Sequence, residues 1–300
     1  MRRVARSTPA QLLIAFGRTL TGAQKPFDAD ANEQVSLCRS GIPHRTRTHA
    51  STVLAECGNG LVTVAWVMSP GAAVIRGVMF DFHATLVDHR DSGAWIEAAV
   101  QRLESTPGQW QGLDPELVPA VTEHLEQIWG HADTIDPGSS RDLSQVRHRE
   151  VFIEAVGLFP GVDPGLGEAL YAVMADQWVA FDDTMPVLTE LAERGVPIVV
   201  VSNIGIDIRP FLSQAGLADK LDGVVLSYEV GSVKPQPEIF AHALDLLDMP
   251  AGDALMVGDS WHDDAGAAAV GIRTLILPRT SGPSHGLEAV LRLVGAPRSF

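Results

Sequence analysis

Five short apolar runs separated by helical stretches constrain the fold of this chain more than any other feature. The runs lie at 74–81, 196–202, 223–227, 254–258 and 272–277. Apolar strands that alternate with helices are typical of a parallel sheet, because each crossover helix packs on one face of it. The sequence therefore predicts an α/β fold with a parallel sheet covered on both faces.

The stretch between the first two runs is too long for an ordinary connection. It contains helix-like segments near 93–105, 115–129, 142–156 and 165–180. A loop of this length without secondary structure would be uncommon in a compact domain. We therefore expect a helical insertion at 89–181, between two parts of one core at 74–88 and 182–300.

The first 73 residues mix Arg, Thr, Ser and Gly without sustained periodicity. They predict a mobile extension, or a biological start further along, at Met68, at Met79 or near Val74. A small accessory unit is the alternative. In each case we expect the segment to lie outside the catalytic part.

Polar side chains stand where the apolar runs end. Asp81 follows Val78-Met79-Phe80, Ser202 follows 198–201, and Asp259 follows 255–258. Ligands bind at the carboxyl ends of the strands in open α/β sheets, so these side chains predict one shared site. Taken singly, each also fits a residue that caps a turn. Two carboxylates in one cleft repel each other unless a cation joins them, and oxygen ligands favour Mg²⁺.

The constellation resembles the haloacid dehalogenase-like (HAD) hydrolase superfamily, which uses an Asp, a Ser or Thr, a Lys and an acidic cluster in that order. The likeness runs from about residue 76 to 279. It includes Gly-Ser-Val-Lys-Pro-Gln-Pro-Glu-Ile-Phe at 231–240 and Val-Gly-Asp-Ser-Trp-His-Asp-Asp at 257–264. The resemblance implies a Rossmann-like parallel sheet core with an inserted helical C1 cap.

The resemblance also implies roles for individual residues. Asp81 would be the nucleophile that forms an aspartyl-phosphate. Ser202, Asn203 and Lys234 would hold the transferred phosphoryl group. The implied Mg²⁺ ligands are Asp81, the backbone carbonyl of His83, Asp259 and Asp264, with Asp263 as the alternative to Asp264. One residue is missing before Gly271 relative to the family pattern, so the choice between these two acids stays open, as does a helix N-terminal role for either.

His83 departs from the family pattern. Phosphatases of the family usually carry a second Asp two residues after the nucleophile, and this chain has a histidine there. An imidazole with a pKa near 6.5 can protonate a leaving group and then activate water. Alternatively, His83 is structural and only its carbonyl serves the metal.

Three functions are compatible with these residues. The favoured one is a Mg²⁺-dependent phosphatase of a small phosphorylated metabolite. The second is a 2-haloacid dehalogenase-type hydrolase, which the non-acidic residue at 83 permits and the acidic cluster opposes. The third is a noncatalytic protein that binds phosphate and Mg²⁺.

The composition narrows the partners and the compartment. The net charge is −15, and the residues after Arg76 include 13 Lys or Arg against 33 Asp or Glu. Such a surface disfavours nucleic acid, and no apolar run approaches the roughly 20 residues that span a bilayer. Both cysteines, Cys38 and Cys57, precede the predicted core, which suits a reducing cytoplasm. The substrate and the oligomeric state cannot be read from the sequence.

Overall fold

The computed structural model describes residues 51–57, 60–66, 74–89, 91–105, 110 and 112–294. Most of the predicted extension therefore lies outside the described residues. Within it, β1 (Ser51–Cys57) and β2 (Gly60–Trp66) pair as an antiparallel hairpin, with Ser51 opposite Trp66. The sequence analysis did not predict these strands.

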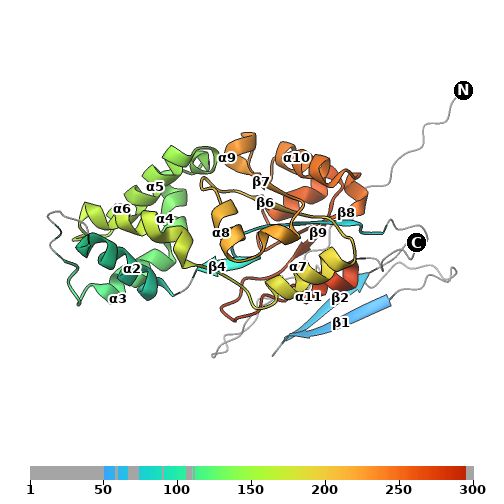
Figure 1. Ribbon diagram of the computed structural model, residues 1–300, viewed down its shortest axis with the longest axis horizontal. Helices are drawn as coiled ribbons and strands as arrows, with labels where there is room; N and C mark the ends of the chain where they lie inside the picture. Colours follow the sequence, from blue (N-terminus) through green and yellow to red (C-terminus); the bar gives the residue numbers. More distant parts are fainter. Residues whose placement is uncertain are drawn as a thin grey trace, which may run out of the picture. The chain divides into compact units, whose positions relative to one another are not determined.

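A five-stranded parallel sheet forms the centre of the remaining structure (Figure 1). Its order is β7-β6-β3-β8-β9. The strands are β3 (Gly77–Phe80), β6 (Ile198–Ser202), β7 (Gly223–Leu226), β8 (Ala254–Gly258) and β9 (Arg273–Ile276). Each predicted apolar run contains one of these strands, so the predicted α/β fold is confirmed.

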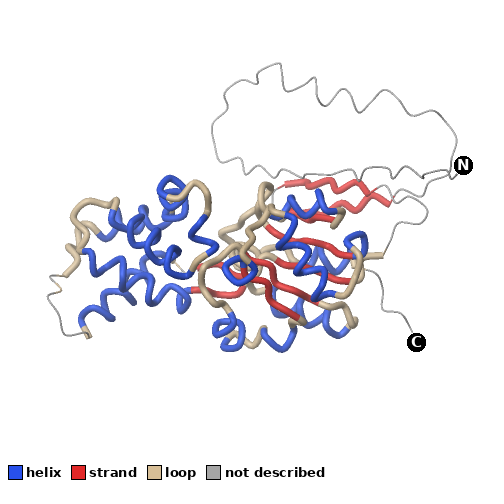
Figure 2. The backbone as a smooth tube through the Cα atoms, turned by 90° about the horizontal axis from the view of Figure 1, so that it is seen from above, coloured by secondary structure: helices blue, strands red, loops and turns tan. Residues whose placement is uncertain are grey.

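Alternate side chains of the central strand enter two different apolar cores. Val78 and Phe80 pack on one side, whereas Met79 packs on the other, as the two-residue period of a strand requires. The first face is covered by α7 (Thr184–Glu193), α8 (Arg209–Gln214) and α11 (Glu288–Leu293). The second is covered by α10 (Pro237–Leu247) and the 3-10 helix η6 (Asp264–Val270). Figure 2 shows helices on both sides of the strands.

The long stretch after β3 is a helical insertion, seen in green at the left of Figure 1. It comprises α2 (Ser92–Glu104), α3 (Val118–Glu126), α4 (Ile128–Ile135), η2 (Ser140–Leu143), α5 (Gln145–Gly157), α6 (Pro164–Val173) and η3 (Met174–Gln177). The side chains of Asp91, Ser144 and Asp163 cap α2, α5 and α6 by accepting backbone N–H groups. These residues are favoured caps because their side chains satisfy amides that have no partner within the helix.

The insertion leaves and rejoins the core through a two-stranded antiparallel ribbon. β4 (Val87–His89) pairs with β5 (Trp178–Ala180), and Val87 lies opposite Ala180. The prediction of a helical segment that extends to residue 180 was wrong here, because β5 occupies its last three residues. The single segment predicted at 115–129 is divided by the structure at Gln127 into α3 and α4.

The described residues from Val74 onward belong to one compact unit. The division of this unit at 89 and 181 therefore stays a prediction, although β4 and β5 lie close to both positions. The short elements α9 (Ser227–Val230), η4 (Ala218–Lys220) and η5 (Ala251–Asp253) complete it. Among the described residues, no helix has the length and apolarity that crossing a bilayer requires.

Candidate active site

Asp81 is the first residue after the central strand β3, at the carboxyl edge of the sheet. Its backbone N–H donates to the Val257 carbonyl at 2.8 Å, which fixes the start of the loop against β8. The residue is buried. Burial raises the pKa of the Asp81 carboxyl, and the nearby Lys234 ammonium opposes that change. The Asp81 carboxylate thus lies at the carboxyl edge between the ends of β6 and β8, the two neighbours of β3.

Lys234 joins two buried carboxylates. Its Nζ donates to Asp81 Oδ1 at 2.6 Å and to Asp264 Oδ1 at 2.7 Å. Burial disfavours the charged form, but the two carboxylates outweigh it and raise the pKa of Lys234. Breaking such a buried pair by removing one partner costs about 3–5 kcal/mol. The lysine is therefore a fixed cation beside Asp81.

Asp264 is completely buried and tightly enclosed. It lies at the start of η6, and the Ser260 backbone N–H donates to its Oδ2 at 2.9 Å. A Cβ on Gly258 would lie 2.0 Å from this oxygen, so a glycine is required at the end of β8. Burial raises the pKa of Asp264 to about 6, although Lys234 lowers it.

Asp259 completes the acidic group. It follows β8 directly, and its Oδ2 accepts from Arg279 Nε at 2.5 Å. Burial raises the pKa of Asp259, against the attraction of Arg279. The Asp259 side chain is 6% exposed, whereas that of Arg279 is 73% exposed. The guanidinium therefore reaches this carboxylate from solvent.

The oxygens of Asp81, Asp259 and Asp264 can hold one cation. Each residue offers a carboxylate oxygen, and these oxygens lie within 4.8 Å of one another. Each of the three carboxyl groups has a raised pKa because burial disfavours its charge. A hard divalent cation with oxygen ligands relieves that cost, which makes the donor set suitable for Mg²⁺. We call these three residues the carboxylate group.

Asp263 lies outside the carboxylate group. Its Oδ2 accepts from the Ser260 hydroxyl at 3.1 Å, and its Oδ1 lies 2.7 Å from His262 Nδ1. Of the two acids that the sequence leaves open, Asp264 is the one that the fold brings beside Asp81. The metal role of Asp264 remains a proposal.

Ser202 and Asn203 close the site on the β6 side. Ser202 is the last residue of β6 and is buried. Asn203 Nδ2 donates to the Lys234 carbonyl at 2.9 Å, while its Oδ1 accepts from the Lys234 N–H at 2.7 Å. Both ends of the amide are bound to the lysine backbone. Asn203 therefore positions Lys234, and the phosphate contact predicted for Asn203 stays a prediction.

His83 lies in the loop between β3 and β4, with its side chain 31% exposed. Burial lowers the pKa of the imidazole to about 4, although Asp88 raises it. The ring is therefore neutral at pH 7, where it can accept a proton but is rarely present as an acid. Within the same loop, Thr85 Oγ1 donates to Asp81 Oδ2 at 3.4 Å.

The insertion packs directly on the loops at the carboxyl edge. Ser227 Oγ, after β7, donates to the Asp142 carbonyl at 2.5 Å. A Cβ on Gly205, after β6, would lie 2.5 Å from His148 Cβ and 2.7 Å from the Arg141 carbonyl. The buried His148 Nδ1 lies 3.0 Å from the Tyr171 hydroxyl. The start of α5 therefore forms part of the cover over the site.

Sequence reasoning missed Arg279 and the need for glycine at 258. Arg279 lies three residues after β9, at the same edge of the sheet, and this position was the available signal. The contact of Arg279 with Asp259 depends on the path of the loop after β9, which the sequence pattern does not specify. Gly258 belongs to the motif at 257–264, but its close approach to Asp264 is visible only in the folded structure.

Comparisons with known proteins agree on one family. The haloacid dehalogenase-like hydrolase family matches residues 75–271. A ribulose-1,5-bisphosphate 5-phosphatase of Halopiger xanaduensis is 37% identical over 39% of this chain, a match that spans half of that relative. A phosphoglycolate phosphatase of Cupriavidus necator is 36% identical over 65% of this chain and 77% of its own length.

Solved structures agree with that match. A 2-haloacid dehalogenase of Pseudomonas syringae pv. Tomato is 25% identical, with a TM-score of 0.50 over 73% of this chain and 97% of that one. This chain therefore shares its fold with that dehalogenase. The family match covers most of the chain and the whole path from β3 to η6, so this protein is a member of the haloacid dehalogenase-like hydrolase family.

Proposed function

We propose that the protein is a Mg²⁺-dependent phosphatase of a small phosphorylated metabolite and acts through an aspartyl-phosphate on Asp81. The observation that carries this proposal is the carboxylate group, in which a nucleophile candidate is bonded to a buried ammonium and faces two more acids. The phosphatase names of the two relatives support the same class of substrate. The cysteine-free sequence after Cys57 suits a cytoplasmic setting.

In the first step, a carboxylate oxygen of Asp81 attacks phosphorus, the bond from phosphorus to the leaving oxygen breaks, and that oxygen takes up a proton from water. Oδ1 accepts from Lys234 Nζ at 2.6 Å, whereas the Thr85 hydroxyl contacts Oδ2 at the longer distance of 3.4 Å. We therefore assign the attack to Oδ2. Lys234 neutralises charge on the phosphoryl oxygens, and Asn203 holds the lysine backbone in place.

In the second step, water attacks the phosphorus of the aspartyl-phosphate and restores the Asp81 carboxylate. His83 stands two residues after Asp81, where the family usually has an Asp. It is our candidate to accept the proton of that water. Asp81, Asp259, Asp264 and the His83 carbonyl would hold Mg²⁺. The bound cation would offset the negative charge of the phosphoryl group and of the carboxylates.

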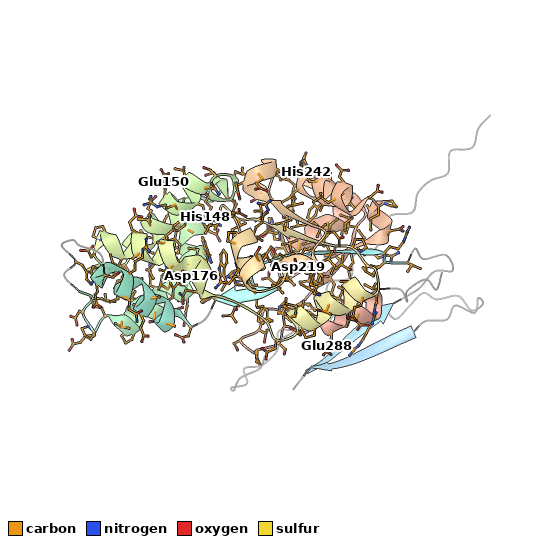
Figure 3. The ribbon with its side chains drawn as sticks, viewed as in Figure 1. His148, Glu150, Asp176, Asp219, His242 and Glu288 are labelled. Carbon is orange, nitrogen blue, oxygen red and sulfur yellow. The ribbon has the colours of Figure 1, made fainter. Side chains whose placement is uncertain are left out.

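The insertion would select the substrate and exclude water. Its contacts at Gly205 and Ser227 bring η2 and the start of α5 against the loops of the site. Exclusion of water strengthens electrostatic interactions during phosphoryl transfer. Arg279 at the site and His148 on α5 are candidates for contacts with the substrate, and His148 is labelled in Figure 3.

The test is a panel of small phosphate esters assayed with and without Mg²⁺, beside a chloride-release assay on 2-haloacids. We expect phosphate release that requires Mg²⁺ and is lost in Asp81→Asn, whose amide is similar in shape but cannot act as the nucleophile. Chloride release without metal would instead favour the dehalogenase. Phosphate binding without release of either product would favour the noncatalytic protein.

A further inference from the structure

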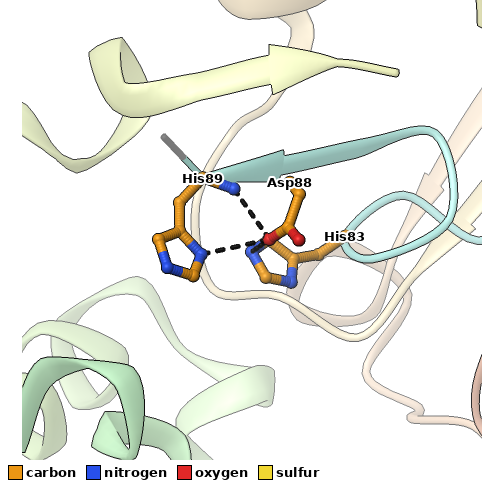
Figure 4. A group of neighbouring side chains, drawn as sticks. All are labelled: His83, Asp88 and His89. Carbon is orange, nitrogen blue, oxygen red and sulfur yellow. Dashed lines mark hydrogen bonds and ion pairs between the residues drawn. The ribbon is translucent and has the colours of Figure 1, made fainter. Parts of the chain in front are cut away.

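A second group of metal-ligating side chains lies beside the carboxylate group. His83, from the loop after β3, meets Asp88 and His89 of β4, as Figure 4 shows. His89 Nδ1 lies 3.1 Å and His83 Nε2 3.9 Å from Asp88 Oδ1. The two imidazole rings are nearly parallel, with centroids 6.2 Å apart. Two nitrogens and one oxygen therefore face a common point.

Backbone contacts hold these three residues in place. The Ala84 N–H donates to the Val87 carbonyl at 2.6 Å, and the Leu86 N–H donates to the Phe82 carbonyl at 2.9 Å. These bonds close the loop that brings His83 beside β4. On the far side, β5 fixes β4, with Asp88 opposite Val179 and His89 opposite Trp178. The arrangement is thus determined by the fold, which reduces the cost of ordering the ligands.

The ligand types identify the class of ion. Zinc is commonly bound by imidazole nitrogen and carboxylate oxygen at about 2.0–2.2 Å, so neighbouring ligand atoms in a tetrahedral site lie about 3.3 Å apart. The distances from Asp88 Oδ1 to His89 Nδ1 and to His83 Nε2, 3.1 and 3.9 Å, lie on either side of that value. Mg²⁺ prefers an all-oxygen set and is disfavoured here.

Exposure and charge also bear on binding. The side chains of His83, Asp88 and His89 are 31%, 36% and 32% exposed, so an ion can enter and keep a water as a further ligand. Arg279 is close enough to repel a cation, since it lowers the pKa of His83. The Asp88 carboxylate offsets this repulsion, and Arg279 has its own partner in Asp259.

We propose that His83, Asp88 and His89 form a second cation site, separate from the carboxylate group, which takes a borderline transition-metal ion such as Zn²⁺. An ion there would engage the His83 imidazole and tie the loop after β3 to β4, the strand that leads into the insertion. On the proposed function, occupation of this site inhibits phosphate release.

Binding can be tested without activity. The full-length protein is stripped with a chelator, saturated with Mg²⁺ to fill the carboxylate group, and titrated with Zn²⁺ against a chromogenic chelator and with Co²⁺ by visible absorption. We expect Zn²⁺ and Co²⁺ to bind the parent, and His89→Ala and Asp88→Asn to weaken Zn²⁺ by at least about tenfold, since even outer-shell changes cost 10–100-fold.

His131→Ala is the matched control. His131 stacks on His124 with ring centroids 4.3 Å apart, but this pair belongs to none of the metal-ligating groups among the described residues. The control should bind Zn²⁺ like the parent. Equal Zn²⁺ affinity in the parent and in folded His89→Ala, verified by circular dichroism, would overturn the proposal. If His89→Ala fails to fold, the Zn²⁺ affinities of His89→Gln and Asp88→Asn are compared with that of the parent instead, and affinities equal to the parent's would overturn the proposal.

The inhibitory role has a separate readout. In saturating Mg²⁺, Zn²⁺ should inhibit phosphate release by the parent, and His89→Ala should need about tenfold more Zn²⁺ relative to its own uninhibited rate. Zn²⁺ bound at His89 without inhibition overturns this role alone. A protein that binds Zn²⁺ through His89 but hydrolyses no phosphate ester contradicts the proposed function and supports the metal site.

Discussion

Charged residues are used differently at the sheet edge and in the helical insertion. At the edge, Lys234 is 3% exposed and bonded to acids from two other loops. On α5 of the insertion, Arg149 is 50% exposed and pairs with Glu168 of the adjacent α6. Buried charges need fixed partners, whereas surface pairs contribute little to stability. The comparison indicates that Lys234 fixes the acids at the sheet edge, whereas the pair between Arg149 and Glu168 adds little to the fold.

Substitution of Lys234 should have the largest effect on stability. Lys234→Met leaves Asp81 and Asp264 without their shared cation, and we expect unfolding to become easier by about 3–5 kcal/mol in the absence of metal. Denaturant unfolding at pH 8 measures this. Lys220→Met is the control, since Lys220 lies in η4 before β7 and not at the carboxyl edge. Equal stability of the two variants would contradict the comparison.

His83 lies between the two regions and should have an intermediate effect. If its imidazole moves a proton, His83→Ala should lower turnover by roughly 10²- to 10⁴-fold. Because the pKa of His83 is lowered to about 4, the neutral ring serves water attack better than leaving-group protonation. The loss should therefore be similar for activated and alkyl phosphates when the second step limits the rate. A loss below about threefold on both substrates would make His83 structural.

The carboxylate group predicts how metal and pH act together on stability. Burial raises the pKa of Asp264 from 3.8 to about 6, so the folded chain holds a proton that the unfolded chain has released between these values. Without metal, stability from this group therefore falls as the pH rises through that window. Mg²⁺ needs the ionised form, so its stabilisation should be small at pH 5 and reach about 2.7 kcal/mol at pH 8 at 100 times Kd.

Thermal unfolding with and without Mg²⁺ at both pH values measures this difference. Asp259→Asn removes one ligand of the group and serves as the control, in which the gain should be reduced at pH 8. A gain of the same size at pH 5 and pH 8 would mean that the stabilising ion binds elsewhere.

The surface pair on the insertion should show the smallest effect. Arg149→Ala removes the contact with Glu168, and we expect a loss of about 0–1 kcal/mol with turnover close to the parent. Arg147→Ala, which removes a second surface pair with Glu150, should behave alike; Glu150 is marked on α5 in Figure 3. A loss of turnover as large as that of His83→Ala would place Arg149 at the substrate.

The strands and the polar residues at their ends were predictable because the pattern that forms them is local. Each strand of the sheet lies in a short apolar run, and Asp81, Ser202 and Asp259 lie at or directly after the ends of their strands. Because the strands of a parallel sheet run in the same direction, these ends then lie at one edge. No contact distant in sequence had to be known in advance.

The ribbon of β4 and β5 was not predictable for the opposite reason. Each strand has three residues, and the whole insertion separates Val87 from its partner Ala180 in the sequence. The same limit applies to Arg279 and to the choice between Asp263 and Asp264. Adjacent residues on one turn point in different directions, and contacts distant in sequence, such as that between Lys234 and Asp264, distinguish them.

The central claim is that Asp81 carries the phosphoryl group, and an acid-quench experiment tests it most directly. The parent is mixed with a phosphate ester and Mg²⁺, stopped in acid within one turnover, digested, and examined by mass spectrometry. The account predicts one added phosphoryl group on the peptide that contains Asp81, absent in Asp81→Asn and without Mg²⁺. Phosphate release by the parent with no labelled peptide, together with parent-like turnover in Asp81→Asn, would contradict it.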